Sequence, residues 1–520
     1  MKCVPPHTVK ALALRLLGVL LTAFAVPLSI SAQSLDAIGV TALRNAVPSM
    51  LGTGVTVGQV EAGDPSWEVN PTASGVQQPL ILFNWASAAG TSISFPNGAG
   101  FESGHADTVA SRFYGLPNGV APGVAKVLNY EANYFYTNVI GGSIKIPAAI
   151  VNQSYVLSAS LPNTDSYFDN YAAKYGVLFV NGAGNGGPVF SPATSFNCIA
   201  VGVYGASSST GPTSDGRCKP DITAPDAYTS FSAPQVAGAA AVLLQAAQEG
   251  AGGGSLAATN TVLLKALLLN GAVKPADWTT SVALPLDSRY GTGILNLLNS
   301  YRQLRGGVQP RSSTSTALIG GSHLPPATTT NIPVRRGWDY GTIISSVSRD
   351  AFNHYFFDVT SGTRTSYVFT ATLAWMKRDG ASSVNNLDLY FYDASNNTLI
   401  ASSQSLANNV EHIYVPSLPP GHYDLQVMKN GGSGNALETY GLAFDFGPIQ
   451  SPVLTNSIVL NGRFNVKALA EPSQRVVLQG TTDYQSWTPL LTNTVGFQGS
   501  TTFTNAQTGN FRFYRACQQE

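Results

Sequence analysis

The chain has 520 residues, of which only 11% are charged, and its 28 basic residues are balanced by 28 acidic ones. This balance gives no basic footprint that would suggest nucleic-acid binding, so we expect no nucleic-acid partner. Glycine is abundant, with 52 residues, which indicates many turns rather than long helices.

The N-terminal residues have the pattern of an export signal. Basic residues precede an apolar run over residues 16–30, and small residues follow it. This pattern predicts a signal peptide over residues 1–32, cleaved after Ala32. An uncleaved membrane anchor is the alternative, but the run is short for a bilayer span. We therefore expect a secreted, extracellular protein that is not attached to a membrane after cleavage.

Three segments then place polar side chains at the ends of predicted strands or at the start of a helix. Residues 54–60 are rich in β-branched residues and predict a strand that ends at Glu61 and a glycine turn. Residues 103–111 predict the start of a helix around His105, the only histidine between residues 33 and 322. Residues 177–186 predict a buried strand that opens into a glycine-rich turn carrying Asn185.

The most informative segment is residues 228–238, in which Ser230 lies at the start of a predicted helix. Small and apolar residues continue through Leu244, so this helix must be buried and closely packed. A hydroxyl at a helix N-terminus lies near free backbone N–H groups and the positive end of the helix dipole. Such a position suits a nucleophile whose reaction creates an oxyanion. An N-cap on an ordinary core helix is the alternative.

Together these segments resemble the subtilisin-like serine peptidases. The family's serine motif, Gly-Thr-Ser-Met-Ala-Ser/Thr-Pro-His-Val-Ala-Gly, is matched by residues 228–238, with Tyr228 in place of the first glycine. Its histidine motif is matched at His105, Val109 and Ala110. Connecting segments also occur in the family order, at residues 119–122, 151–154, 192–195 and 219–225. The resemblance covers about residues 45–300 and implies an α/β fold with a mostly parallel sheet flanked by helices.

The resemblance also implies a serine endopeptidase that cleaves protein or peptide substrates and needs no cofactor for its chemistry. Ser230 would be the nucleophile and His105 the general base. Asn185 would stabilise the oxyanion together with the backbone N–H of Ser230. Ser154 and Gly184 would bind the substrate backbone.

One departure from the family concerns the acid of the triad, which is normally aspartate and is here Glu61. Glutamate is one methylene longer, but acid–His–Ser hydrolases with glutamate exist on other folds. Asp64 lies beyond the turn, and Asp107 would point elsewhere on its helix. We therefore expect Glu61 to be the acid.

Three other interpretations are open. A sedolisin-like site would replace the histidine and the oxyanion amide by acidic residues, and it fits less well because His105 and Asn185 occupy the subtilisin positions. A catalytically impaired subtilase-fold protein that binds through its β domains is the main alternative, and Glu61 supports it. In the third, the β modules define the function by adhesion.

The cysteines leave two possibilities for pairing. Cys198 begins a predicted strand, Cys218 precedes residues 219–221, and the loop between them is rich in serine and glycine. An export compartment permits a Cys198–Cys218 disulfide, and two buried free thiols are the alternative. Cys517 would remain unpaired.

After the predicted peptidase domain (residues 33–305), the composition changes. Residues 306–336 are rich in Gly, Ser, Thr and Pro and predict a linker or a wrapped extended segment. Short alternating segments then predict an antiparallel β-sandwich over residues 337–448, and residues 451–520 form a small β-rich module. The predicted strands of the sandwich cover residues 356–359, 367–375, 386–393, 412–415 and 422–428.

The order of motifs in the sandwich resembles the jelly-roll domain that follows the catalytic domain in some alkaline subtilases. Asp388, Asp393 and Glu411 are candidate ligands for a structural calcium ion there, the alternative being that they are solvated strand and turn residues. We expect the protein to be a monomer.

Overall fold

 The computed structural model describes residues 32–520 apart from 64, 93–99, 328–330, 333, 361–365, 433, 435, 449–451, 461–462, 471–474, 484–485, 496–499, 507–512 and 519–520. The predicted signal peptide, apart from Ala32, and Asp64 therefore lie outside the described residues.

The first part of the chain forms an eight-stranded, mostly parallel sheet with the order β10-β9-β8-β7-β1-β6-β3-β4, in which only β4 runs antiparallel to its neighbour. Its central strands are almost wholly buried, as expected for a parallel sheet covered on both faces. The strands are β1 (Thr56–Glu61), β3 (Phe83–Ser87), β4 (Gly90–Ser92), β6 (Lys126–Glu131), β7 (Ile150–Gln153), β8 (Leu178–Gly182), β9 (Cys198–Tyr204) and β10 (Ile222–Pro225). Two short strands outside it, β2 (Ser66–Glu68) and β5 (Phe101–Glu102), pair with each other.

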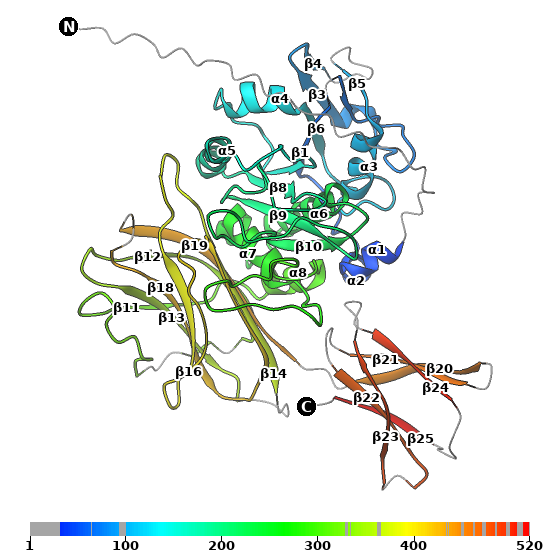
Figure 1. The fold of residues 1–520 in the computed structure, drawn as a ribbon, viewed down its shortest axis with the longest axis vertical. Helices are drawn as coiled ribbons and strands as arrows, with labels where there is room; N and C mark the ends of the chain where they lie inside the picture. The colour runs from blue at the N-terminus through cyan, green and yellow to red at the C-terminus, as the bar shows by residue number, and fades with distance from the viewer. Residues whose placement is uncertain are drawn as a thin grey trace.

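Helices cover both faces of this sheet (Figure 1). On one face α3, α6, α7 and α8 share a large apolar core with Val57 and Val180, and on the other α4, η2 and α5 pack against Val60 and Phe179. Neighbouring strand residues thus alternate between two cores. The helical segments are α1 (Ala32–Ala37), α2 (Val40–Ala46), η1 (Leu80–Leu82), α3 (Gly104–Phe113), α4 (Ala132–Tyr134), η2 (Phe135–Ile140), α5 (Pro162–Tyr175), α6 (Thr229–Gln248), η3 (Leu256–Thr259), α7 (Thr261–Asn270) and α8 (Leu297–Arg305). Among the described residues, none of the helices is both long enough and apolar enough to cross a membrane.

Two antiparallel sheets follow and enclose a second core, so the predicted fold class, an α/β part followed by an antiparallel β-sandwich, is confirmed. One sheet has the order β11-β13-β18-β15-β16 and the other β12-β19-β14-β17. All five predicted sandwich segments overlap strands, and the sequence analysis missed β11, β12, β16 and β19. The strands are β11 (Ser312–Ser315), β12 (Arg336–Ile344), β13 (Ala351–Asp358), β14 (Tyr367–Trp375), β15 (Leu387–Asp393), β16 (Thr398–Ser403), β17 (Val410–Leu418), β18 (His422–Lys429) and β19 (Leu437–Pro448).

The C-terminal residues form two three-stranded antiparallel sheets around a small core of their own. The sheet orders are β20-β21-β24 and β23-β22-β25. The strands are β20 (Val453–Leu460), β21 (Arg463–Leu469), β22 (Arg475–Thr481), β23 (Thr488–Thr494), β24 (Ser500–Ala506) and β25 (Phe513–Gln518).

The sandwich packs directly against the α/β part. In the segment predicted as a linker, β11 pairs with β13, so these residues are an edge strand of the sandwich. Trp338 of β12 lies in the core of the α/β part and donates its ring N–H to the carbonyl oxygen of Leu304 at 2.9 Å. The side chain of Asn197 exchanges two hydrogen bonds with the backbone of Lys377, at 2.7 and 2.8 Å. The two parts therefore share both apolar and polar contacts.

The predicted Cys198–Cys218 disulfide is wrong, because both cysteines are free and buried. The segment that leads into β10 explains the difference, since it directs the Lys219 side chain, not that of Cys218, toward Cys198. The Lys219 Nζ atom lies 3.7 Å from the Cys198 Sγ atom, whereas Cys218 contacts the side-chain amide of Asn408 in the sandwich at 3.5 Å. Burial raises the pKa of the Cys198 thiol to about 11 and also raises that of Cys218. Cys517 is also free.

The three candidate calcium ligands do not belong to a metal-binding cluster among the described residues. Within the described part of the chain, no group of three or more His, Cys, Asp or Glu side chains is arranged to hold a metal ion. Asp388 and Glu411 are buried rather than solvated, and Glu411 accepts hydrogen bonds from the Ser403 hydroxyl and from the Ser405 backbone N–H. Asp393 accepts a hydrogen bond from the Ser395 backbone N–H at 2.8 Å, which is typical of a turn.

Candidate active site

The candidate acid, Glu61, is the last residue of β1 and lies in the middle of the sheet between β6 and β7. Its side chain is only 1% exposed, so its carboxylate depends on hydrogen bonds from the protein. The Glu61 Oε2 atom lies 2.9 Å from the Nδ1 atom of His105. The longer glutamate side chain therefore reaches the imidazole.

His105 is the second residue of α3, whose N-cap Ser103 accepts a hydrogen bond from the backbone N–H of Ala106. Its side chain is 29% exposed, so the ring is reachable from solvent on the side away from Glu61. Burial lowers the pKa of His105, but the hydrogen bond and the negative charge of Glu61 outweigh burial and raise this pKa above its ordinary value. A hydrogen bond from Nδ1–H to Glu61 leaves Nε2 as the basic atom of the neutral ring.

Ser230, the candidate nucleophile, is the second residue of α6, a helix whose residues from Ser232 to Ala247 are all buried. Phe231 follows it, and the rings of Phe231 and His105 lie 5.5 Å apart. The structure therefore brings the serine and the histidine to the same end of the sheet. No hydrogen bond joins Ser230 to His105 in the part of the chain that the structure describes. Catalytic hydrogen bonds are often long before substrate binds.

The candidate oxyanion donor, Asn185, lies in the turn after β8 and is exposed. Its side-chain Oδ1 atom accepts hydrogen bonds from the backbone N–H of Thr229 at 2.9 Å and from the Thr229 hydroxyl at 3.0 Å. Because Thr229 directly precedes Ser230, these bonds hold the Asn185 amide beside the serine. Because the side-chain oxygen of Asn185 accepts these two hydrogen bonds, the amide nitrogen is the atom left to donate outward.

The two predicted substrate-binding residues contact the same helix start. The Ser154 hydroxyl donates to the carbonyl oxygen of Ser230 at 2.8 Å. The backbone N–H of Gly184 donates to the Thr229 hydroxyl at 3.1 Å. Gly184 has a φ of 108°, and a Cβ there would lie 2.5 Å from the Ser209 Oγ atom, so a larger residue would not fit.

Asp107, the nearby alternative acid, faces a different partner. Its Oδ1 atom accepts a hydrogen bond from the backbone N–H of Asn70 at 2.7 Å. The pKa of Asp107 is raised to about 7, mainly by burial and also by the hydrogen bond and charge of Glu102, although the Asn70 N–H acts to lower it. The contact with the His105 ring is made by Glu61.

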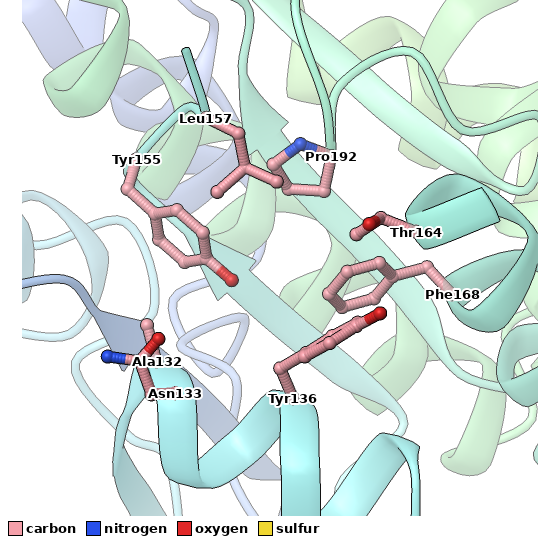
Figure 2. Close-up of a pocket in the computed structure, with 8 residues that line it drawn as sticks. All are labelled: Ala132, Asn133, Tyr136, Tyr155, Leu157, Thr164, Phe168 and Pro192. Atoms are coloured by element: carbon pink, nitrogen blue, oxygen red, sulfur yellow. The ribbon is translucent and has the colours of Figure 1, made fainter. Parts of the chain in front are cut away.

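An apolar pocket lies beside the segment that follows Ser154 (Figure 2). The rings of Tyr155, Tyr136 and Phe168 are turned toward the same space. This lining offers contact area to an apolar group and few hydrogen-bonding partners. The pocket is lined by Ala132, Asn133, Tyr136, Tyr155, Leu157, Thr164, Phe168 and Pro192.

Two polar residues behind Glu61 were missed by the sequence analysis. Gln59 and Tyr114 are fully buried, and hydrogen bonds connect Tyr114 to Gln59 and Gln59 to Glu61. The sequence does carry a signal for Gln59, because a polar residue two positions before Glu61 in a strand shares its face. Tyr114 carries no such signal, since its place depends on how α3 packs on the sheet.

One family model and several solved structures are similar to this chain. Residues 95–293 match the model of the Subtilase family, a range that includes His105, Asn185 and Ser230 and begins after Glu61. Among solved structures, a protease from Pseudoalteromonas arctica PAMC 21717 is similar, with 18% identity, 50% of this chain and 93% of that chain covered, and a TM-score of 0.36. The PatG macrocyclase has 16% identity over 51% of this chain and 95% of that chain, with a TM-score of 0.36. Over residues 95–293 the chain is therefore similar to the Subtilase family.

Proposed function

We propose that the protein is a secreted serine endopeptidase that hydrolyses peptide bonds of extracellular proteins through an acyl-enzyme on Ser230. The observation that carries this proposal is the 2.9 Å contact between Glu61 Oε2 and His105 Nδ1, at the end of the sheet where α6 presents Ser230. Secretion rests on the signal peptide predicted for residues 1–32.

In the proposed mechanism, Glu61 holds His105 in the tautomer that has its basic nitrogen at Nε2. This nitrogen takes the proton of the Ser230 hydroxyl while Oγ attacks the scissile carbonyl carbon. The carbonyl oxygen becomes an oxyanion, which the Asn185 side-chain N–H and the Ser230 backbone N–H stabilise. His105 then protonates the leaving amine, and a water molecule hydrolyses the acyl-enzyme by the same steps.

Labelling with a fluorophosphonate tests the nucleophile. We expect the wild-type protein to be labelled and Ser230→Ala to remain unlabelled, because the reagent reacts with an activated serine hydroxyl. Ser232→Ala is the matched control, since Ser232 lies two residues further along α6 and its hydroxyl donates to the Ala224 carbonyl oxygen at 2.8 Å. This control should be labelled. A folded wild-type protein without any labelling would contradict the proposal and favour the impaired, binding alternative.

Replacement of Asn185 tests the oxyanion donor. We expect Asn185→Ala to lower kcat about 10²–10³-fold with little change in KM, because the lost N–H acts on the transition state. Asn185→Asp is the control, because aspartate keeps an oxygen for the two Thr229 hydrogen bonds and lacks the N–H donor. It should lose at least as much activity. Near wild-type turnover in Asn185→Asp would instead assign Asn185 to anchoring Thr229.

A further inference from the structure

The carboxylate of Glu61 has a second partner besides His105. Gln59 lies two residues earlier in β1 and is 0% exposed. Its Nε2 atom donates to the Glu61 Oε1 atom at 2.8 Å and to the carbonyl oxygen of Ala106 at 2.9 Å. One oxygen of the carboxylate is thus bound to Gln59 and the other to His105, and both N–H groups of the Gln59 amide are engaged.

Tyr114 determines which way the Gln59 amide faces. The Tyr114 hydroxyl donates to the Gln59 Oε1 atom at 2.6 Å. Burial raises the pKa of Tyr114 well above its ordinary value, and the charges of Glu61 and Asp107 add to this effect, so the phenol keeps its proton. A flipped amide would bring its oxygen against two acceptors, the Glu61 carboxylate and the Ala106 carbonyl. The hydrogen-bond network therefore has one favourable orientation.

We propose that Gln59 and Tyr114 are positioning residues, which hold the Glu61 carboxylate for its contact with His105. A glutamate has one more rotatable bond than an aspartate, so a fixed carboxylate position needs an additional restraint. The chain from Tyr114 through Gln59 to Glu61 supplies that restraint at the carboxylate oxygen that His105 does not use. This inference rests on the proposed function, because it concerns the same acid and base.

The proposal predicts a pH effect with a definite sign. A hydrogen-bond donor stabilises the charged form of a carboxylate. Without the Gln59 donor, the pair of Glu61 and His105 would hold its proton more strongly. The acid limb of the kcat/KM profile, over which activity falls as the pH falls, should therefore move to higher pH. Loss of the Glu61 charge itself should move this limb to lower pH. A merely structural role for Gln59 would produce neither shift.

The experiment compares the pH profiles of kcat and KM in wild type, Gln59→Met and Tyr114→Phe. Methionine has nearly the volume of glutamine but no N–H donor. We expect kcat of Gln59→Met to fall about 10²-fold, because small displacements of a catalytic group have effects of this size, and KM to stay unchanged. Tyr114→Phe should shift the acid limb in the same direction by a smaller amount. If Gln59→Met does not fold, the pH profile of Tyr114→Phe decides whether the positioning role holds.

Gln245→Met is the matched control for removal of a buried glutamine. Gln245 is 1% exposed and accepts hydrogen bonds from the backbone N–H groups of Leu51, Gly52 and Thr53, near the far end of α6. Its replacement should lower thermal stability without moving the acid limb. Wild-type kcat and an unmoved acid limb in folded Gln59→Met would overturn the proposal.

A readout that does not need turnover separates this inference from the proposed function. A ring N–H bound to a carboxylate gives a strongly downfield proton signal, and His105→Ala identifies the one that belongs to His105. We expect Gln59→Met to weaken or shift this signal. An unchanged signal would overturn the positioning role even in a wild-type protein that proved inactive, whereas inactivity alone would overturn only the proposed function.

Discussion

Replacing Glu61 by glutamine is expected to lower kcat about 10⁴-fold, the size of effect seen when a triad acid becomes an amide. Glutamine is the same length, so the packing around β1 is retained. Its amide can present an N–H to the Nδ1 atom of His105, which favours the tautomer in which Nε2 carries the proton and cannot act as the base. The substitution of Glu61 by glutamine also removes the negative charge that raises the pKa of His105.

The residual activity of Glu61→Gln should therefore show its acid limb at lower pH than the wild type. Hydrolysis of a fluorogenic peptide between mildly acidic and alkaline pH, with circular dichroism as the test of folding, measures both effects. Asp107→Asn is the matched control, because Asp107 is bonded to the Asn70 backbone, and it should retain most of the activity. Wild-type activity in Glu61→Gln, together with a large loss in Asp107→Asn, would move the acid's role to Asp107.

Much of the fold and of the candidate site could be predicted because local sequence carries it. Buried parallel strands appear as apolar runs, and the side chains that end them, such as Glu61 and Asn185, are therefore at one edge of the sheet. The small residues after Ser230 likewise indicated a helix that is buried on every side, as α6 is. These features depend on residues close together in the chain.

The features that were missed depend on residues far apart in the chain. A Cys198–Cys218 disulfide was one of the two pairings that the sequence left open, but both thiols are free and the Lys219 side chain lies beside Cys198 instead. The Tyr114 hydroxyl reaches Gln59 across 55 positions of sequence. Such contacts follow from the packing of one element on another, and no periodicity in the chain reports them.

The sandwich has a structural role that follows from α7. This helix, with the sequence TVLLKALLLN, is apolar almost all round, and all ten of its residues are buried. A helix of this kind needs cover on every side. Residues of α7 and of the sandwich, including Ala374, Val410 and Ala443, belong to one core. A Cβ on Gly441 of β19 would lie 2.8 Å from the Leu263 Cα atom, so the two backbones are in close contact.

Removal of the sandwich is therefore expected to abolish folding of the α/β part. A chain of residues 33–311 should aggregate and show no cooperative unfolding by calorimetry, because one side of α7 would be left facing water. The matched control is a chain that ends at residue 448. It should fold and keep its activity, because the module that it lacks has a core of its own. A soluble, cooperatively folded chain of residues 33–311 would contradict this role.

Two asparagines at the interface test the same role in the full-length chain. Asn270 is 2% exposed, and its side-chain oxygen accepts hydrogen bonds from the hydroxyls of Thr370 and Thr372, at 3.0 and 2.9 Å. Asn270→Ala should lower the free energy of unfolding by about 3 kcal/mol, since it leaves buried polar groups without partners. Asn170 makes an exposed contact with the Gly380 N–H, so Asn170→Ala should change it by less than about 0.5 kcal/mol. If Asn270→Ala and Asn170→Ala lowered the free energy of unfolding equally, the buried part of this interface would not stabilise the α/β part.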